Sequence, residues 1–392
     1  MTRDPAMKPD NGESVAASGA ADWVGHDPER AHTLPSRYFY DRDIFEREKQ
    51  TIFYGAWHPV AHKNELAEPG RFVTLDIFDQ SVIVVTAKDG ETRAFHNVCQ
   101  HRGNRLIMAR RGTLSGPIRC SYHAWSYAPD GRLVAAPRCE RLKDFSMDDY
   151  GLKPVRLEQF ASFLFINLDN DATPIAEQMP GADDAMRQHC PDLDVLEFHS
   201  ATDFLVDANW KVVIDNAIEG YHFGLSGPVH QALADLIVYD EYAMTAHGNW
   251  WTFAGPSKPD LTHAFGEPID GADYQTSDFF NIQLWPSYIF YCFPYADFLG
   301  TFLIMPLEPE KTLLHLDYYV PPRAMNALTK ACLNWMNEQL GPEDIGLNVS
   351  VQKGLRSFGY DRGRYIIDAE RSNMSEHLVH HFHSLVHERI WS

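Results

Sequence analysis

Two short segments of the sequence each combine a cysteine with a histidine. They read Cys99-Gln-His101 and Cys120-Ser-Tyr-His123 and are separated by eighteen residues. Zinc fingers of the Cys2His2 type place both cysteines in one half and both histidines in the other. A [2Fe-2S] cluster in which two cysteines hold one iron and two histidines hold the other needs one residue of each type from two facing loops. The spacing therefore predicts such a cluster, with a zinc-only site as the alternative.

A second group of ionisable residues falls on one predicted helix. The pattern of residues 210–221 is helical and places Asp215, Glu219 and His222 at positions i, i+4 and i+7, on one face. Burying a carboxylate together with an imidazole is costly unless they bind a metal or each other. A ferrous ion that activates O2 takes two imidazoles and a carboxylate on one side, which leaves the opposite positions open. The stripe indicates such a site or, alternatively, a solvated helix face.

These two groups of residues resemble the motifs of Rieske non-heme iron oxygenases. The words Cys99-Gln-His-Arg-Gly and Cys120-Ser-Tyr-His-Ala-Trp-Ser-Tyr are similar to the two loops of the oxygenases, and they lack the additional cysteines of respiratory Rieske proteins. In the oxygenases an acidic residue, and four positions later an acidic bridging residue, precede the first iron histidine. The resemblance implies that His222 binds a mononuclear Fe(II) and that Glu219 is the bridging residue.

The resemblance also implies the two remaining iron ligands. The second histidine of the family usually follows the first after four or five residues, whereas the next histidine here is His230, and no other precedes His247. The segment that begins at residue 341 resembles the family segment that supplies the carboxylate, which implies Asp344. Its neighbour Glu343 is the competitor, because adjacent helical residues point about 100° apart and only one is expected to face the metal. An exposed acidic residue at a helix start is the other interpretation.

The elements that must position these residues divide the chain in two. Residues 57–168 read as short β segments, among them 71–78 and 81–86, with Asp-Gly turns at 89–90 and 130–131. A small all-β module is the natural expectation, and the boundary should lie between about 170 and 200.

The second half mixes the helix at 210–221 with aromatic strands near 285–293 and 315–320 and a helix over 324–340. This pattern predicts an α+β fold with helices packed on an antiparallel sheet. A histidine-rich stretch at 375–388 is a metal-binding tract in one interpretation and an ordinary helix face in the other. The predicted division is a disordered tail and lead-in helix at 1–45, a Rieske [2Fe-2S] domain at 46–180 and a mononuclear iron catalytic domain at 181–392.

The composition limits the class of protein. The chain has 392 residues, of which 44% are hydrophobic, enough for a sizeable core, and its net charge of -20 argues against nucleic acid or an anionic membrane as a partner. The first 22 residues lack the apolar core of a secretory signal, and no stretch approaches the roughly 20 apolar residues that span a bilayer. Six scattered cysteines favour reduced thiols, and hence the cytoplasm.

The resemblance further implies that electrons come from NADH through a separate flavin reductase and that the subunits form a homotrimer, in which each cluster serves the iron of a neighbour. The glutamate at position 219 resembles the bridging residue of one branch of the family. That branch oxidises carnitine, choline and betaines, by monooxygenation or N-demethylation. Hydroxylation of an aromatic acid and a Rieske electron carrier without oxygenase activity are the alternatives. The aromatic residues considered for a substrate pocket are Trp250, Trp251, Phe253, Trp285, Tyr288, Tyr291 and Phe293.

Overall fold

A computed structural model of the chain describes residues 25–269, 278–323 and 325–391. Most of the predicted disordered tail, residues 1–24, lies outside the described residues. The predicted lead-in helix is α2 (Arg42–Glu48). It begins where the Asp41 carboxylate accepts hydrogen bonds from the backbone N–H groups of Asp43 and Ile44, at 2.8 and 3.1 Å. An aspartate at this position satisfies N–H groups that the first helical turn leaves unpaired.

The first sheet has seven antiparallel strands and forms the predicted β module. Both of its faces are covered, so the run from Val82 to Val85 is wholly buried. Val82 and Val84 pack in the main core, whereas Ile83 and Val85 pack in a second, smaller core, as the alternation of side chains along a strand requires. In order across the sheet, the strands are β1 (His58–His62), β10 (Phe163–Asn167), β9 (Pro154–Phe160), β4 (Thr92–His96), β3 (Gln80–Thr86), β2 (Arg71–Ile77) and β5 (Arg111–Thr113).

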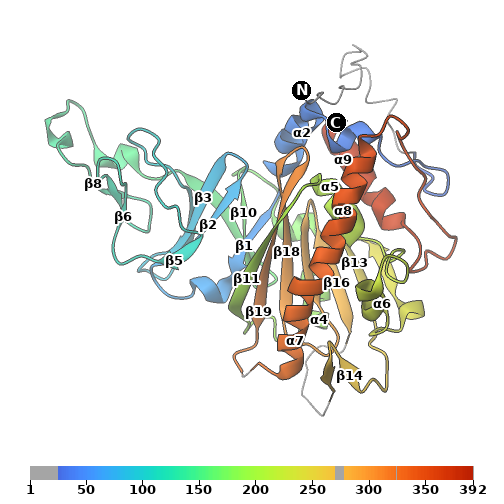
Figure 1. Ribbon diagram of the computed structural model, residues 1–392. Coiled ribbons are helices and arrows are strands. Elements are labelled where there is room, and N and C mark those ends of the chain that lie inside the picture. The colour runs from blue at the N-terminus through green and yellow to red at the C-terminus, as the bar shows by residue number, and fades with distance from the viewer. Residues whose placement is uncertain (1–24, 270–277, 324, 392) are drawn as a thin grey trace, which may run out of the picture.

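The smaller core belongs to a lobe that extends away from the rest of the molecule (Figure 1). It contains Cys99, Cys120, Trp125 and Tyr127, all of which are buried. This lobe carries both predicted cluster loops, and we call it the cluster lobe. A short antiparallel sheet within it consists of β6 (Ile118–Arg119), β7 (Ser126–Tyr127) and β8 (Leu133–Ala135).

A second sheet of seven strands dominates the C-terminal half, and every neighbouring pair in it is antiparallel. With the helices that pack on it, this sheet confirms the predicted α+β class. In order, its strands are β11 (Glu197–Val206), β19 (Lys311–Val320), β18 (Leu299–Glu308), β17 (Tyr288–Cys292), β16 (Phe279–Leu284), β13 (Trp250–Gly255) and β12 (Ala243–Ala246). A separate two-stranded sheet pairs β14 (His263–Ala264) with β15 (Glu267–Pro268).

Helices cover one face of the second sheet, as Figure 1 shows for α7 and α8. The predicted helix at 324–340 is in fact part of a longer helical run: α7 (Ala327–Trp335) is followed by a π-helical turn at Met336–Leu340 and at once by α8 (Gly341–Leu355). No helix among the described residues is long and apolar enough to cross a membrane. The other helices are α3 (Ile175–Gln178), α4 (Ala182–His189), α5 (Trp210–Ala217), α6 (Pro228–Ala234) and α9 (His377–Trp391).

The predicted helix over residues 210–221 is wrong in its length. α5 ends at Ala217, and the chain leaves the helix before it reaches Glu219. The carbonyl of Gly220 accepts a hydrogen bond from the Tyr239 hydroxyl. A side chain at Gly220 would meet the carbonyl oxygen of Asn373 at 2.8 Å. Because these contacts come from segments distant in sequence, the local pattern could not reveal where the helix ends.

The two large sheets share one core. The ring of Phe163 on β10 packs against Phe290 on β17 and Tyr319 on β19, with ring centroids 4.9 and 5.2 Å apart. β10 ends at Asn167 and β11 begins at Glu197, so the predicted boundary region of 170–200 contains the change from the first sheet to the second. The finer division between residues 180 and 181 stays a prediction.

A buried glutamine on α8 links distant parts of the chain. Oε1 of Gln352 accepts a hydrogen bond from the backbone N–H of Asn209, at the start of α5, at 2.9 Å. Its Nε2 donates to the carbonyl of Phe39 at 3.1 Å and to the Glu310 carboxylate at 2.9 Å. α5, α8 and the segment before α2 are therefore joined through one side chain.

Candidate metal centres

The two predicted cluster loops follow the same backbone path. In each loop the N–H of the fourth residue after the cysteine donates to the carbonyl of that cysteine: Gly103 to Cys99 at 3.0 Å, and Ala124 to Cys120 at 3.1 Å. Both closing residues have a positive φ, 75° and 60°. Glycine adopts this conformation without strain, whereas Ala124 holds it against a steric cost, which is a feature of functional loops.

The four predicted cluster ligands converge in this lobe. The imidazole rings of His101 and His123 have their centroids 4.7 Å apart. Cys99 and Cys120 are buried, with 2% and 3% of their surface exposed, whereas both histidines are exposed. Two thiols on the inner side and two imidazoles on the outer side form the donor set of a cluster with one cysteine-bound and one histidine-bound iron. The residues therefore fit a Rieske cluster.

Polar groups adjoin both cysteine sulfurs. The hydroxyl of Tyr127 lies 3.3 Å from Sγ of Cys99, and Nδ2 of Asn104 lies 3.6 Å from Sγ of Cys120. The Tyr127 oxygen also accepts a hydrogen bond from the backbone N–H of Gln100 at 2.9 Å, so its own proton is free to point at the sulfur. Hydrogen bonds to the sulfurs help to set the reduction potential of such clusters.

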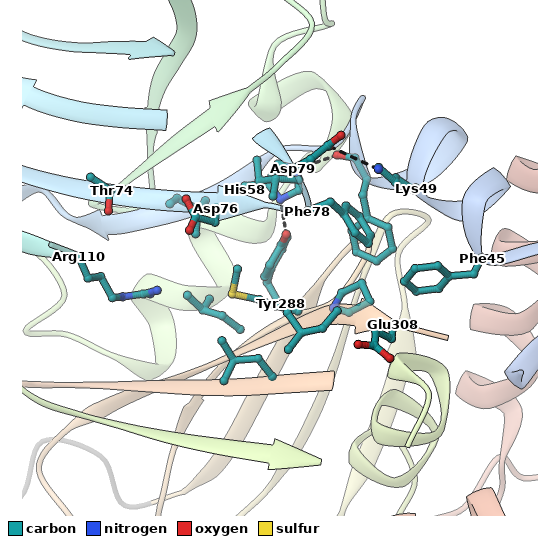
Figure 2. A pocket seen from close by; sticks show the side chains of 18 of the residues that line it. Phe45, Lys49, His58, Thr74, Asp76, Phe78, Asp79, Arg110, Tyr288 and Glu308 are labelled. Atoms are coloured by element: carbon teal, nitrogen blue, oxygen red, sulfur yellow. Dashed lines mark hydrogen bonds and ion pairs between the residues drawn. The ribbon is translucent and has the colours of Figure 1, made fainter. Parts of the chain in front are cut away.

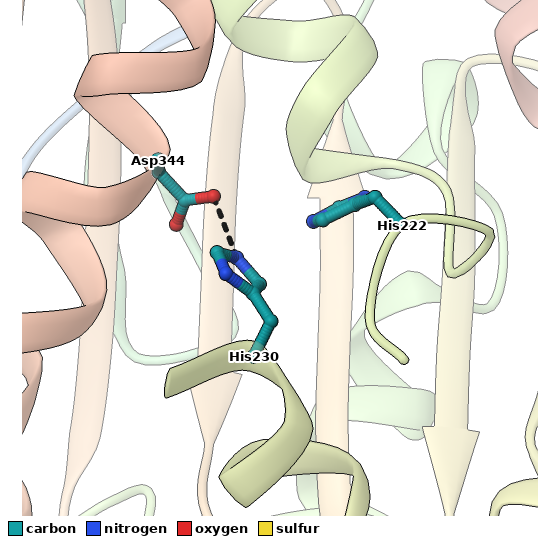
Figure 3. A group of neighbouring side chains, drawn as sticks. All are labelled: His222, His230 and Asp344. Carbon is teal, nitrogen blue, oxygen red and sulfur yellow. Dashed lines mark hydrogen bonds and ion pairs between the residues drawn. The ribbon is translucent and has the colours of Figure 1, made fainter. Parts of the chain in front are cut away.

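His222, His230 and Asp344 meet although they come from three separate segments (Figure 3). One ligand atom from each lies within 4.8 Å of the other two. Two imidazoles and a carboxylate that converge in this way fit a ferrous ion with open coordination positions. The structure thus brings together the three residues predicted for the iron. His247, the next histidine along the chain, instead stacks on Trp250 with a centroid distance of 4.0 Å.

His222 lies in the turn that follows α5, and the adjacent Glu219 fixes its orientation. The Glu219 carboxylate accepts a hydrogen bond from the backbone N–H of His222 at 3.1 Å and contacts Nδ1 of its ring. A carboxylate on one ring nitrogen holds the imidazole and leaves Nε2 for the triad. Glu219 is therefore beside the triad without belonging to it.

His230 on α6 lies between two carboxylates. Oδ1 of Asp344 is 2.9 Å from Nε2 of His230, while Glu343 contacts Nδ1 and accepts from the His230 backbone N–H at 3.0 Å. Asp344 belongs to the triad, whereas its neighbour Glu343 approaches the opposite ring nitrogen of His230. Burial lowers the pKa of His230, but the hydrogen bonds to Asp344 and Glu343 outweigh burial and raise it.

The glycine-rich loop between the two histidines makes room for Glu343. A Cβ atom added at Gly227 would lie 2.1 Å from Oε1 of Glu343. The loop between His222 and His230, which is longer than the family spacing, can therefore pack closely against Glu343. The unusual position of His230 is thus accommodated by a glycine that only the folded structure explains.

Asp215 does not join the triad. Its carboxylate accepts a hydrogen bond from Nε2 of His383 at 3.0 Å, and Nδ1 of His383 is 2.8 Å from the Tyr365 hydroxyl. Other histidines of α9 donate to backbone carbonyls: His377 to Met244, His380 to Gly25 and His381 to Gly248. The histidine-rich stretch is therefore a structural helix face, which confirms the second of its two interpretations.

A cavity of about 90 Å3 adjoins the triad. Of the seven aromatic residues considered for a substrate pocket, with ordinary strand core as the alternative, Phe293 lines this cavity and the other six do not. Many of the other lining residues are aliphatic, and among the rest are four phenylalanines and three amides: Phe204, Phe223, Phe279 and Phe302, with Asn216, Asn281 and Asn348. One signal was present in the sequence, because Asn281 interrupts the apolar strand β16, all six residues of which are buried.

A larger cavity, of about 560 Å3, lies away from the triad, against β2 (Figure 2). Leu303 and Met305 line it, whereas Ile304 lines the triad cavity, so the two cavities lie on opposite faces of β18. Arg110 lines it, and two buried guanidinium nitrogens of this residue have no hydrogen-bond partner among the described residues. None of the predicted metal ligands lines this cavity, so the smaller cavity is the candidate substrate site.

Two family models match the chain. Residues 56–146 match the Rieske [2Fe-2S] domain, and residues 187–392 match the catalytic domain of the ring hydroxylating alpha subunit. The first match contains all four predicted cluster ligands, and the second contains the triad.

The chain is also similar to individual proteins over most of its length. It is 37% identical to the carnitine monooxygenase oxygenase subunit of Escherichia coli (strain K12), over 92% of this chain and 94% of that protein. It is 29% identical to the chloroplastic choline monooxygenase of Arabidopsis thaliana, over 92% and 84%. The crystal structure of the quaternary ammonium Rieske monooxygenase CntA with L-carnitine aligns with a TM-score of 0.83 at 33% identity, covering 93% of this chain and 97% of that one.

Proposed function

Because the chain belongs to the family of Rieske-type ring-hydroxylating oxygenase alpha subunits, we propose that it is the terminal oxygenase component for a quaternary ammonium substrate. As a member of this family it is an oxidoreductase with a Rieske [2Fe-2S] cluster and a mononuclear iron. When bound, the cluster supplies single electrons and the iron activates O2 for monooxygenation or N-demethylation. The chain's own residues hold these groups, bind the substrate and exclude water.

We assign the ligands by the positions of their donor atoms. Two buried thiols and two exposed imidazoles suit the cluster, and the convergent triad suits the iron. The proposed cluster ligands are Cys99, His101, Cys120 and His123, and the proposed iron ligands are His222, His230 and Asp344. Glu343 is assigned a supporting role, because it holds the ring nitrogen of His230 that faces away from Asp344.

The lining of the triad cavity is the observation that carries the substrate class. Phe279 lies between Phe223 and Phe293, at centroid distances of 6.3 and 5.1 Å, and all three rings line the cavity beside the triad. Aromatic faces attract alkylammonium cations, whose methyl groups also pack well on apolar rings. A trimethylammonium group would thus rest beside the iron position. The carnitine and choline monooxygenases among the relatives support a substrate of the carnitine, choline or betaine type.

We also propose that the active unit is a homotrimer in which Glu219 bridges two subunits. A groove of about 340 Å3 is lined by Glu219 and His222. The imidazoles of His101 and His123 are exposed and are therefore available for contact with such a groove on a second copy of the chain. A carboxylate there would accept the proton of the second ring nitrogen of a cluster histidine.

A separate flavin reductase that oxidises NADH is the proposed electron donor, as in the family. The protein is proposed to work in the cytoplasm, because its six cysteines are all buried and free of disulfides.

The test of the function is O2 consumption by the purified, iron-loaded protein with a surrogate reductase and NADH. Carnitine, choline and glycine betaine should stimulate O2 uptake and yield an oxidised or demethylated product, while benzoate and salicylate should not. Coupled oxidation of the aromatic acids alone would refute the proposed substrate class.

A further inference from the structure

Two buried amide groups line the triad cavity without any protein partner. Asn281 on β16 and Asn348 on α8 are 7% and 3% exposed. Within the part of the chain that the structure describes, neither side chain has a hydrogen bond to another residue. Their amide atoms are not among the fully buried unpaired atoms, so they are accessible from the cavity that they line. These two groups are therefore available to a molecule in the cavity.

Apart from the proposed iron, the same cavity offers no cationic side chain of lysine or arginine among its described lining residues. Among the described residues that line it, the ionisable ones are His222, His230 and Asp344, the three proposed iron ligands, and none is a lysine or an arginine. A carboxylate on the substrate would have no opposite side-chain charge here. Burial of an unpaired ionised group costs far more than burial of a hydroxyl or carbonyl that forms hydrogen bonds.

The two ends of a quaternary ammonium substrate thus meet different surroundings. The trimethylammonium end fits the phenylalanine rings beside the triad. The other end must pair with amides, which both donate and accept hydrogen bonds. A hydroxyl group also donates and accepts, whereas a carboxylate only accepts and brings a charge. The small volume of the cavity, about 90 Å3, further favours a compact molecule.

We propose that this cavity selects quaternary ammonium compounds whose tail ends in an uncharged hydrogen-bonding group, and that Asn281 and Asn348 are the residues that determine this specificity. The inference rests on the proposed function and narrows it: compact amino alcohols are preferred over amino acid betaines.

Matched substrate pairs test the inference on the wild-type holoenzyme. One pair is (2-hydroxyethyl)trimethylammonium and (carboxymethyl)trimethylammonium, and the longer pair is (4-hydroxybutyl)- and (3-carboxypropyl)trimethylammonium. The alcohol of each pair should have a kcat/KM at least about tenfold higher than the carboxylate, and it should bind more tightly in calorimetry. A tenfold preference corresponds to about 1.4 kcal/mol. Equal or better use of the carboxylates would overturn the inference and leave the proposed function intact. Failure of all four compounds with both metals present would overturn the proposed function itself.

Variants assign the selectivity to the two amides. Asn281→Leu and Asn348→Leu should each lower kcat/KM for the alcohols by about tenfold, as expected for a lost buried hydrogen bond. At equal iron content, both should lower kcat/KM for ethyltrimethylammonium, which has no polar tail, by less than they lower kcat/KM for the alcohols. Asn170→Leu, at an exposed position, is the matched control and should change neither.

A charge introduced at the same place gives an independent readout. Asn281→Lys should reverse the preference within each pair, because the buried carboxylate then gains a partner. If this variant binds alcohols and carboxylates in the wild-type ratio, Asn281 does not contact the tail and the assignment is wrong.

Discussion

Lys211 of α5 and Glu48 of α2 form an ion pair that is buried on both sides, with 0% and 1% of the side chains exposed. The second oxygen of Glu48 accepts a hydrogen bond from Nε1 of Trp210 at 2.8 Å. Burial raises the pKa of Glu48 and lowers that of Lys211, so each charge depends on the other. The pair fixes the start of the helix that leads to His222.

Removal of one partner of this ion pair should therefore lower the free energy of unfolding more than removal of both. Lys211→Met leaves a buried carboxylate uncompensated and should lower the free energy of unfolding by about 3–5 kcal/mol. The double variant Glu48→Gln/Lys211→Met should recover much of that loss, because glutamine still accepts from Trp210. Urea unfolding of four proteins measures this: wild type, Lys211→Met, Glu48→Gln and the double variant. Additive effects of the two substitutions would contradict the coupling.

Substitution of the two neighbouring carboxylates at His230 should have different effects on the iron content of the protein. Asp344→Ala should lower the iron count from about three to about two per chain and leave the cluster spectrum unchanged. Glu343→Ala removes the partner of Nδ1 and of the backbone N–H of His230, and should weaken mononuclear iron binding by about 10–100-fold without abolishing it. His247→Ala is the control with full iron. Retention of all iron in Asp344→Ala would move the ligand to another residue.

Tyr127 should tune the cluster without holding it. Tyr127→Phe removes the hydroxyl 3.3 Å from Sγ of Cys99. A hydrogen bond to the sulfur stabilises the reduced, more negative cluster, so its loss should lower the reduction potential and leave the iron content at the wild-type value. Redox titration followed by visible absorption measures the shift. Cys99→Ser should instead lose the cluster spectrum, whereas His222→Ala should keep it.

Glu219→Gln tests the proposed bridge between subunits. The substitution keeps the size of the side chain and removes its charge, so both metals should be retained and reduction of the cluster by the reductase should be normal. With pre-reduced protein, substrate and O2, reoxidation of the cluster should slow by about tenfold or more, the scale of other losses of such supporting carboxylates. Wild-type reoxidation at full iron occupancy would exclude the bridge.

Glu376 gives a prediction for pH dependence. Burial raises its pKa from 4.5 to about 7, with Glu219 and Asp215 adding to the shift and His383 opposing it. The unfolded chain therefore loses this proton at lower pH than the folded chain, so the stability contributed by the protonated group falls as pH rises from 4.5 to about 7. Glu376→Gln should be more stable than wild type at pH 8 and no more stable at pH 4.5. A pH-independent difference in urea unfolding would contradict this assignment.

The sequence predicted the donor atoms better than their surroundings. The cluster ligands follow from short spacings, because a few residues of each loop determine its geometry. The location of Asp344 followed from a family segment, but the approach of Glu343 to the other side of His230 depends on Gly227, 116 positions earlier. Contacts of this kind are set by tertiary packing, which a local pattern does not contain.

The same limit applies to the helix before His222 and to the substrate cavity. The sequence pattern predicted that α5 continues past Gly220. The prediction failed because the contacts at Gly220 come from Tyr239 and Asn373, which are distant in the sequence. The aromatic strands were predicted correctly as strands, yet alternation along β17 and β13 does not say which face meets the triad. In the sequence, Asn281 stands out as a polar residue in a largely apolar segment. An amide carries no charge, however, so its type did not mark it as functional.

Through its contact with Gln352, the N-terminal segment helps to position the triad, although it contributes no residue to it. Asn209 begins the helix that leads to His222, Gln352 follows Asp344 on the same helix by eight positions, and the carbonyl of Phe39 is bound to both through one amide. The spacing between two of the proposed iron ligands is therefore set in part by residues synthesised more than 150 positions before either of them. The segment around Phe39 is synthesised long before Gln352, so the proposed iron site can assemble only after the helix that carries Gln352 has left the ribosome.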